Sequence, residues 1–413
     1  MKPPIIEKQV SIRDDASSGE TFGRESPLYT GRHLLILKEG YRNIRKTANF
    51  MRTSLGLKVA HTADFITEPL DEERVKDADV LVYNELGVVL LGFEDERTER
   101  LETADTTFCL EPEKVIHIPD DFPVEMMDLV EPATWGIQVI GATETPYRGS
   151  GVRLAILDTG FEKQHPDFRG RKVISRSFVS GEGAGDGHGH GTHCAGIACG
   201  FVDEKGTRYG VATEAELYVG KVLSNMGSGA QAWVLNGITW AVNNGCRIIS
   251  MSLGSRVAEG ETYDVAYERA AQYALSKGAV TVAAAGNESK RSRGGFKPID
   301  SPADCPSVLA VAALDAQLQV ADFSNRSINP DAKVDIAAPG VKIFSSWKLP
   351  KRYHTISGTS MAAPLVAGIF ALLYERKPEA TPQQVIRELK ALAQPLPLPA
   401  EDVGAGLCIA PQT

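Results

Sequence analysis

The chain has 413 residues, 43% of them hydrophobic, and a formal net charge of −9, which suits a globular protein of two or three domains. Residues 1–130 hold 16 Lys and Arg against 26 Asp and Glu, whereas residues 131–413 hold 28 against 27, so the two parts are expected to do different work. Neither part offers a basic patch for phosphates, and no apolar run reaches the length of a membrane span. We therefore expect neither a nucleic-acid partner nor a membrane partner.

The N-terminal sequence MKPPIIEKQVSIRDD lacks the continuous apolar stretch of a secretory signal. The six cysteines are scattered and form no Cys-x-x-Cys pair, so we expect them to be reduced and buried. These features predict a cytoplasmic protein, with export by a leaderless route as the open alternative.

The first third of the chain predicts a flexible tail (1–30), a small α+β domain (31–120) and an acidic linker (121–134) that contains two prolines. Within the small domain the apolar patterns predict the order strand, helix, strand, strand, helix, strand. The expected strands are 33–38, 58–65, 87–93 and 114–119, and the expected helices are 41–54 and 94–104.

From residue 135 onward, short apolar runs alternate with helix-like segments, which is typical of a parallel sheet covered on both faces. In such sheets, functional residues collect at the carboxyl ends of the strands. Asp158, Ser252–Gly254 and Gly286–Asn287 all occupy such positions. The expected strands are 152–158, 216–222, 247–253, 279–285 and 308–314, and the expected helices are 190–200, 229–244, 262–277, 359–375 and 382–394.

The segment GDGHGHGTHCAG contains three histidines, His188, His190 and His193, which admit two interpretations. A zinc site would use them as ligands, but such a site also needs a fourth ligand and supporting partners, and only Gly and Thr separate the histidines. In the second interpretation one histidine is a catalytic base.

A base of this kind activates a serine and is itself oriented by a carboxylate. Asp158 ends an apolar strand in LAILDTGFEKQHPDF, and Ser360 lies in ISGTSMAAPLVAG at the start of an apolar helix. Alone, either residue reads as a helix or turn cap. Together with the histidine segment they favour an Asp/His/Ser triad over a metal site.

The segments DTGFEKQHPDF, HGTHCAG and GTSMAAP resemble, in this order, the Asp, His and Ser motifs of the subtilisin-like (subtilase) serine proteases. AAAGNES and VDIAAPGVKIFSS resemble two further blocks of that family. The resemblance covers 135–412 and implies a three-layer α/β fold with a mostly parallel sheet. It also implies a serine endopeptidase that forms an acyl-enzyme.

Carried over by motif, the resemblance makes Ser360 the nucleophile, His190 the general base and Asp158 its orienting carboxylate. Asn287 then donates its side-chain amide to the oxyanion, together with the backbone N–H of Ser360. His193 is expected to be structural and His188 to lie on the surface. Cys194 is expected near the catalytic helix, where it could confer sensitivity to thiol reagents.

The same resemblance implies that a protein or peptide substrate adds a strand to the enzyme's edge segments. Small residues on the wall of the main substrate pocket favour an apolar side chain on the substrate. Glu288 keeps a preference for a basic side chain as an alternative. The resemblance implies chemistry that needs no cofactor and no metal. Structural calcium is common in the family, but the sequence shows no run of calcium ligands to which a site could be assigned. The expected substrate-binding residues are Gly227, Ser228, Gly229, Ser252, Leu253, Gly254, Ala284, Ala285 and Gly286.

Residues 31–120 resemble, in pattern and position, the ferredoxin-like α+β inhibitory propeptide of subtilases. The resemblance implies an autoprocessed zymogen whose N-terminal domain is an intramolecular inhibitor, with a processing site in the linker. Three alternatives remain open: limited processing of a dedicated partner, a prodomain-capped binding protein with little activity, and an unrelated N-terminal adaptor domain.

Overall fold

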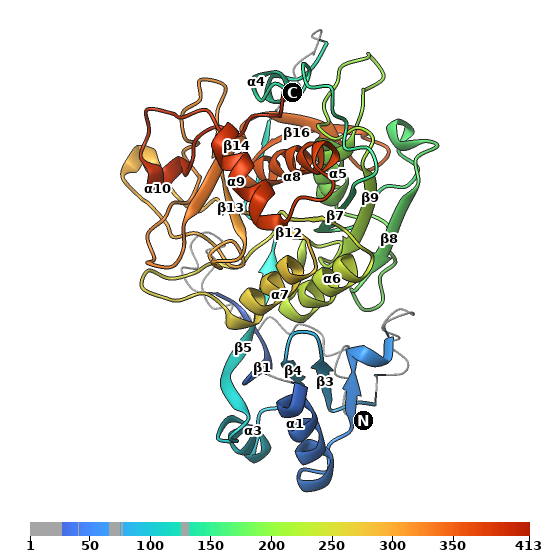
Figure 1. The fold of residues 1–413 in the computed structure, drawn as a ribbon, viewed down its shortest axis with the longest axis vertical. Helices are drawn as coiled ribbons and strands as arrows, with labels where there is room; N and C mark the ends of the chain where they lie inside the picture. The colour runs from blue at the N-terminus through green and yellow to red at the C-terminus, as the bar shows by residue number, and fades with distance from the viewer. Residues whose placement is uncertain (1–26, 40, 66–74, 76, 125–131) are drawn as a thin grey trace, which may run out of the picture.

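A computed structural model describes residues 27–39, 41–65, 75, 77–124 and 132–413 (Figure 1). A small N-terminal unit packs against the helices α6 and α7 of a larger unit, and the end of strand β5 passes from the small unit into the larger one. The predicted tail lies largely outside the described residues, and the first strand, expected at residue 33, begins at Tyr29.

The small unit is an open sheet with the strand order β5-β1-β4-β3-β2, in which only the β2–β3 pair is parallel. The strand β3 was not predicted from the sequence, and the strand expected at 58–65 is only the short edge strand β2. Of β5, only the end was predicted, at 114–119. The elements are β1 (Tyr29–Leu37), α1 (Tyr41–Ser54), β2 (Val59–His61), β3 (Val80–Tyr83), β4 (Val88–Leu91), α3 (Glu96–Glu102) and β5 (Thr107–His117), with a 3₁₀ turn at Thr62–Phe65.

Both faces of this small sheet are covered. Leu35 and Val89 pack with α1 in a separate apolar cluster, whereas their neighbours Leu34 and Leu90 join the core of the larger unit. Successive residues of a strand point to opposite faces, so a sheet covered on both sides needs unbroken apolar strands. The runs HLLIL and VVLL therefore encode the docking of the small unit as well as its own core.

The larger unit is built on seven parallel strands in the order β14-β13-β12-β11-β7-β9-β8. The sequence pattern predicts the parallel sheet and five of its strands, whereas β8 and β14 were not predicted. Helices α5 and α8 contact each other and the sheet, and α6 and α7 lie between the sheet and the small unit (Figure 1). The strands are β7 (Arg153–Asp158), β8 (Val173–Ser177), β9 (Glu216–Lys221), β11 (Ile248–Met251), β12 (Val280–Ala284), β13 (Leu309–Leu314) and β14 (Val334–Pro339). The helices are α4 (Trp135–Val139), α5 (His190–Cys199), α6 (Gln231–Asn243), α7 (Val265–Ser276), α8 (Thr359–Arg376), α9 (Pro382–Leu392) and α10 (Ala400–Val403), with 3₁₀ turns at Pro166–Phe168 and Arg291–Arg293.

The two units are joined by strand pairing. β5 pairs with β10 (Ser228–Ala230) of the larger unit. Further along, β6 (Phe122–Val124) pairs with β16 (Tyr353–Ser357), which also pairs with β15 (Ile343–Ser346). The predicted linker therefore contains a strand, although residues 125–131 lie outside the described ones. Within the described part, no helix is both long and apolar enough to cross a membrane.

Two buried carboxylates of β5 meet the starts of α6 and α7. Glu113 accepts a hydrogen bond from Ala232 N at 3.0 Å and pairs with Arg32 of its own unit. Glu111 accepts from Val265 N at 2.9 Å. The first N–H groups of a helix have no partner within the helix, so Glu113 and Glu111 supply hydrogen-bond acceptors at the starts of α6 and α7.

Candidate active site

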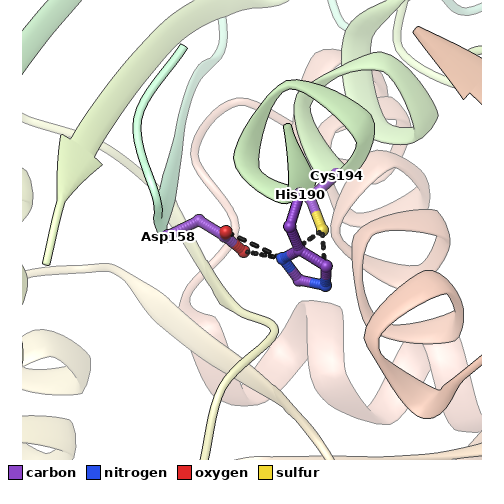
Figure 2. A group of neighbouring side chains, drawn as sticks. All are labelled: Asp158, His190 and Cys194. Carbon is purple, nitrogen blue, oxygen red and sulfur yellow. Dashed lines mark hydrogen bonds and ion pairs between the residues drawn. The ribbon is translucent and has the colours of Figure 1, made fainter. Parts of the chain in front are cut away.

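Asp158 and His190 form the buried centre of the site (Figure 2). Asp158 ends β7, and His190 is the first residue of α5. The imidazole Nδ1 donates to both carboxylate oxygens of Asp158, at 2.8 and 3.0 Å. This contact fixes the tautomer of the ring and leaves Nε2 directed away from Asp158.

Asp186, two residues before His188, holds α5 in place. Its carboxylate accepts from the backbone N–H groups of Gly189 and Thr192, at 2.7 and 2.8 Å, which lie at the start of the helix. It also accepts from the hydroxyl of Thr159, the residue after Asp158. One side chain therefore sets the position of His190 relative to Asp158. No prediction from the sequence assigned this role to Asp186.

Ser360 is the second residue of α8 and is fully buried. Pro364 has no N–H, so it leaves the carbonyl of Ser360, four residues earlier, without its helical donor. That carbonyl instead accepts from the Ser252 hydroxyl at 2.8 Å and from the Cys194 thiol at 3.6 Å. The proline thus allows neighbouring elements to anchor the backbone of Ser360.

Asn287 lies shortly after β12. It borders the space between the segments 227–230 and 252–254, which we call the cleft and through which residues 115–121 of the chain run. Its Oδ1 accepts from the N–H and the hydroxyl of Thr359, at 2.9 and 2.8 Å, which fixes the orientation of the amide. Its Nδ2 consequently points toward the chain in the cleft and donates to the carbonyl of Asp120 at 3.2 Å. Ser360 lies beside the Asp158–His190 pair, because the Cys194 sulfur is 3.8 Å from His190 Nδ1 and 3.6 Å from the Ser360 carbonyl. The Ser360 hydroxyl itself has no hydrogen bond among the described residues.

Residues 115–118 of the chain itself lie between the two predicted edge segments, which are Gly227–Gly229 and Ser252–Gly254. His117 exchanges two backbone hydrogen bonds of 2.9 Å with Gly254, and Ile118 N donates to Gly227 O at 3.0 Å. Ser228, Gly229 and Ala230 pair with His117, Ile116 and Val115. An extended segment thus lies between the two edges, which is the position expected for a substrate strand.

The other predicted substrate-binding residues lie behind these edges. Leu253 is buried, and the Ser252 side chain supports Ser360 rather than facing the cleft. Ala284 ends β12, and Ala285 pairs with β13 through Val311 O. Gly286 N donates to the Thr359 hydroxyl at 3.1 Å.

Asp121, which the sequence analysis placed in the linker without a role, is part of the site. Its Oδ2 lies 2.9 Å from His190 Nε2, and its Oδ1 lies 3.3 Å from Asn287 Nδ2. A Cβ atom at Gly358 would lie 2.1 Å from the Asp121 carboxylate, so this approach requires glycine there. Apart from the acidic pair Asp120–Asp121, no local pattern marks this residue, because its contact with His190 depends on the path that the chain takes after β5.

The two partners of this contact have shifted pKa values. Burial alone would lower the pKa of His190, but the charges of Asp158 and Asp121 outweigh it and hold that pKa well above its usual value. Burial raises the pKa of Asp121, and its contacts with His190 and Ser360 only partly oppose the shift. Protonated His190 facing Asp121 is therefore the arrangement favoured below the pKa of the imidazole.

The other two histidines do not converge on His190 as ligands. His193 donates from Nε2 to the carbonyl of His354 at 3.0 Å, and burial lowers its pKa to about 3, which is a structural role. His188 was expected on the surface, but it is half-buried because its ring packs beside that of Trp347, with the ring centroids 6.3 Å apart. The three-histidine metal interpretation is therefore wrong for the site as folded.

Among the described residues, one group has the spacing of metal ligands: Asp158, His190 and Cys194, whose donor atoms lie within 4.8 Å of one another. Figure 2 shows the Cys194 sulfur next to the imidazole ring of His190. Burial raises the pKa of Cys194 to about 12, so the thiol stays protonated, and calcium prefers oxygen ligands. The group does not fit the structural calcium considered above, which remains unassigned.

Comparisons with known proteins agree with this geometry. A model of the Subtilase family matches residues 149–406. The chain is 38% identical to Subtilisin DY of Bacillus licheniformis over 63% of its own length and 90% of that protein. It is 40% identical to Subtilisin E of Bacillus subtilis (strain 168), over 60% of this chain and 61% of that protein. It is also 40% identical to Thermitase of Thermoactinomyces vulgaris, over 54% of this chain and 75% of that protein.

Proposed function

The chain belongs to the subtilase family and is a serine endopeptidase, and on that premise we propose which of its groups carry out the reaction. The Ser360 hydroxyl attacks the carbonyl carbon of the scissile bond while His190 Nε2 takes its proton. Asp158 stabilises the imidazolium, and the Asn287 amide and the Ser360 N–H bind the oxyanion. His190 then gives the proton to the leaving amine, and water releases the acyl group by the same steps in reverse order.

We further propose that the chain is made as a self-inhibited precursor. The observation that carries this proposal is the course of residues 115–121, which pair with both edges of the cleft before Asp121 contacts His190. With Nε2 bound to Asp121, the imidazole is not free to accept the Ser360 proton. The same segment would have to leave before another peptide could pair with the edges.

The buried apolar face of the small unit supports this reading over an unrelated adaptor domain. Leu34, Ile36 and Leu90 belong to the core of the larger unit, so its sheet is shaped to the peptidase surface. An adaptor that binds third parties would be expected to leave such a face open. We propose that the precursor is cut once by its own site in the linker 121–134.

The test compares the N-terminal sequences of the purified wild-type chain and the Ser360→Ala chain. We expect the wild type to begin within the linker and to cleave a protein substrate, and Ser360→Ala to keep its original N-terminus and cleave nothing. Ser276→Ala, at the exposed end of α7, is the matched control and should behave as the wild type. A Ser360→Ala chain that still processes itself would show that Ser360 is not the nucleophile.

A further inference from the structure

An unused carboxylate, Asp300, lies behind the cleft between its two edge segments. Its N–H donates to Ala285 O at 3.0 Å, and the next residue, Ser301, pairs with Ser255. A Cβ atom at Gly254 would lie 3.3 Å from the Asp300 Cβ, and one at Gly286 would lie 2.8 Å from its Oδ2. Asp300 therefore touches both walls of the space that separates the edges.

This space receives the side chain that determines where a peptide is cut. The bound segment pairs with Gly254, and the carbonyl to be attacked must reach Asn287, directly after Gly286. The side chain of the residue that owns this carbonyl must then enter between the segments 252–254 and 284–286. A side chain that entered there would meet Asp300, which lies against both Gly254 and Gly286.

Asp300 and its neighbour Glu288 each keep one acceptor oxygen without a hydrogen bond among the described residues. Asp300 is only 3% exposed, and its Oδ2 has no donor. Glu288 uses Oε2 to accept from Asn287 N at 2.9 Å and from Asn325 Nδ2 at 2.7 Å, whereas its Oε1 has no hydrogen bond. Leaving such buried acceptors unpaired is unfavourable, so a donor from outside would be stabilised.

The two carboxyl groups have one neighbouring cation. Arg256 Nε lies 3.8 Å from Glu288 Oε1, with the Arg256 side chain 26% exposed. Burial, followed by the negative charge of Glu288 and a hydrogen bond with its side chain, raises the pKa of Asp300 well above its usual value, and Arg256 partly opposes this shift. Asp300 is therefore favoured in its neutral form when no further cation is bound, and a bound ammonium or guanidinium group would favour its ionisation and pair with it.

We propose that Asp300 and Glu288 form a cation-recognition subsite that directs cleavage after lysine or arginine. This inference rests on the proposed endopeptidase function and names its substrate class. An ammonium or guanidinium group supplies both charge and N–H donors to the two free oxygens, whereas an apolar side chain leaves them unpaired. The sequence predicts a pocket wall of small residues that favours apolar side chains. In the proposed subsite this wall ends at the carboxyl groups of Asp300 and Glu288.

The linker agrees with this specificity. Residues 118–134 contain no Lys or Arg, and the Asp120 carboxylate is 74% exposed, 3.4 Å from Arg256, rather than inserted toward the proposed subsite. The segment of residues 115–121 therefore pairs with the edge segments but places no cation in the proposed subsite. It resists cleavage as a substrate, and the single cut proposed above relies on its high effective concentration.

The test uses the wild-type chain after processing and peptides that differ only in the residue before the scissile bond. Arginine is compared with citrulline, its uncharged analogue of nearly the same shape, and with leucine. We expect kcat/KM for arginine to exceed that for citrulline at least tenfold, and Asp300→Asn to reduce this ratio by about tenfold. Glu216→Gln, a carboxylate-to-amide change at an exposed ion pair on β9, should keep the wild-type ratio.

A wild-type ratio near one would overturn the subsite, and so would an Asp300→Asn enzyme that keeps the wild-type ratio. If Asp300→Asn fails to fold, Glu288→Gln provides the second variant, with a reduced ratio expected and an unchanged ratio contradicting the proposal. Failure of the endopeptidase function itself looks different. In that case no peptide is cleaved and Ser360 is not labelled by a serine-directed phosphonate, whatever the residue before the bond.

Discussion

Replacing Asp121 by asparagine removes the negative charge that faces His190 while nearly preserving the size of the side chain. In the structure, Asp121 Oδ2 lies 2.9 Å from His190 Nε2, and the side chains of Asp121 and His190 are 12% and 1% exposed. A hydrogen bond to a charged group contributes about 1.5–3 kcal/mol. Because burial also disfavours the Asp121 carboxylate, the lower end of this range applies, which corresponds to roughly tenfold in the fraction of chains with an open cleft.

The assay measures how fast a serine-directed phosphonate labels Ser360 in the full-length chain, counting only the unprocessed band on a gel. We expect Asp121→Asn to be labelled about tenfold faster than the wild type. Asp120→Asn is the matched control, because its carboxylate is exposed and its contact with Asn287 uses the backbone carbonyl. Equal labelling of the wild type and Asp121→Asn would refute the idea that the Asp121 contact keeps the site closed.

Three further predictions concern buried titratable groups. Burial, then the charge of Asp264, raises the pKa of Glu111 from 4.5 to about 7, so docking of the small unit takes up a proton and weakens as the pH rises through about 7. Glu111→Gln should lose that part of the pH dependence of phosphonate labelling, and an unchanged profile would contradict this. Cys194 should be alkylated by iodoacetamide only after denaturation, since its thiol is buried and protonated; peptide mapping that finds rapid native modification would exclude this. His193→Ala should lower the free energy of unfolding by roughly 1–3 kcal/mol in urea titrations without moving the pH–rate profile, whereas a displaced profile would imply a role in the chemistry.

The sequence was sufficient to predict the parallel sheet and the residues that meet at its edge. Short apolar strands alternate with helices, and the carboxyl ends of parallel strands lie together, so Asp158 and Asn287 could be expected near each other. The segments around His190 and Ser360 added local patterns of small residues that are unusual outside a tightly packed site. These signals are local, so they can be recognised in the sequence without knowledge of the tertiary contacts.

The errors lie where structure depends on distant partners. The strand Val80–Tyr83 was missed because it is four residues long and gains its stability from β4 and from the surface of the larger unit. Most of β5 was missed because Glu111 and Glu113 interrupt its apolar pattern. Their partners are helix starts more than a hundred residues away. No local pattern could distinguish these carboxylates from solvated ones.

The sequence by itself was enough to recognise the family from its motifs and to predict the parallel sheet from strand periodicity, and the expected catalytic residues followed from the family resemblance. Only the tertiary structure decided the surroundings of Asp121 and Asp300. Asp121 reaches His190 because β5 pairs with β10 and carries the chain across the cleft, and Asp300 lies against Gly254 and Gly286, where a Cβ atom would crowd it. An aspartate in a loop looks the same in the sequence whether it is solvated or buried, and its chemistry is set by the partners that folding brings to it.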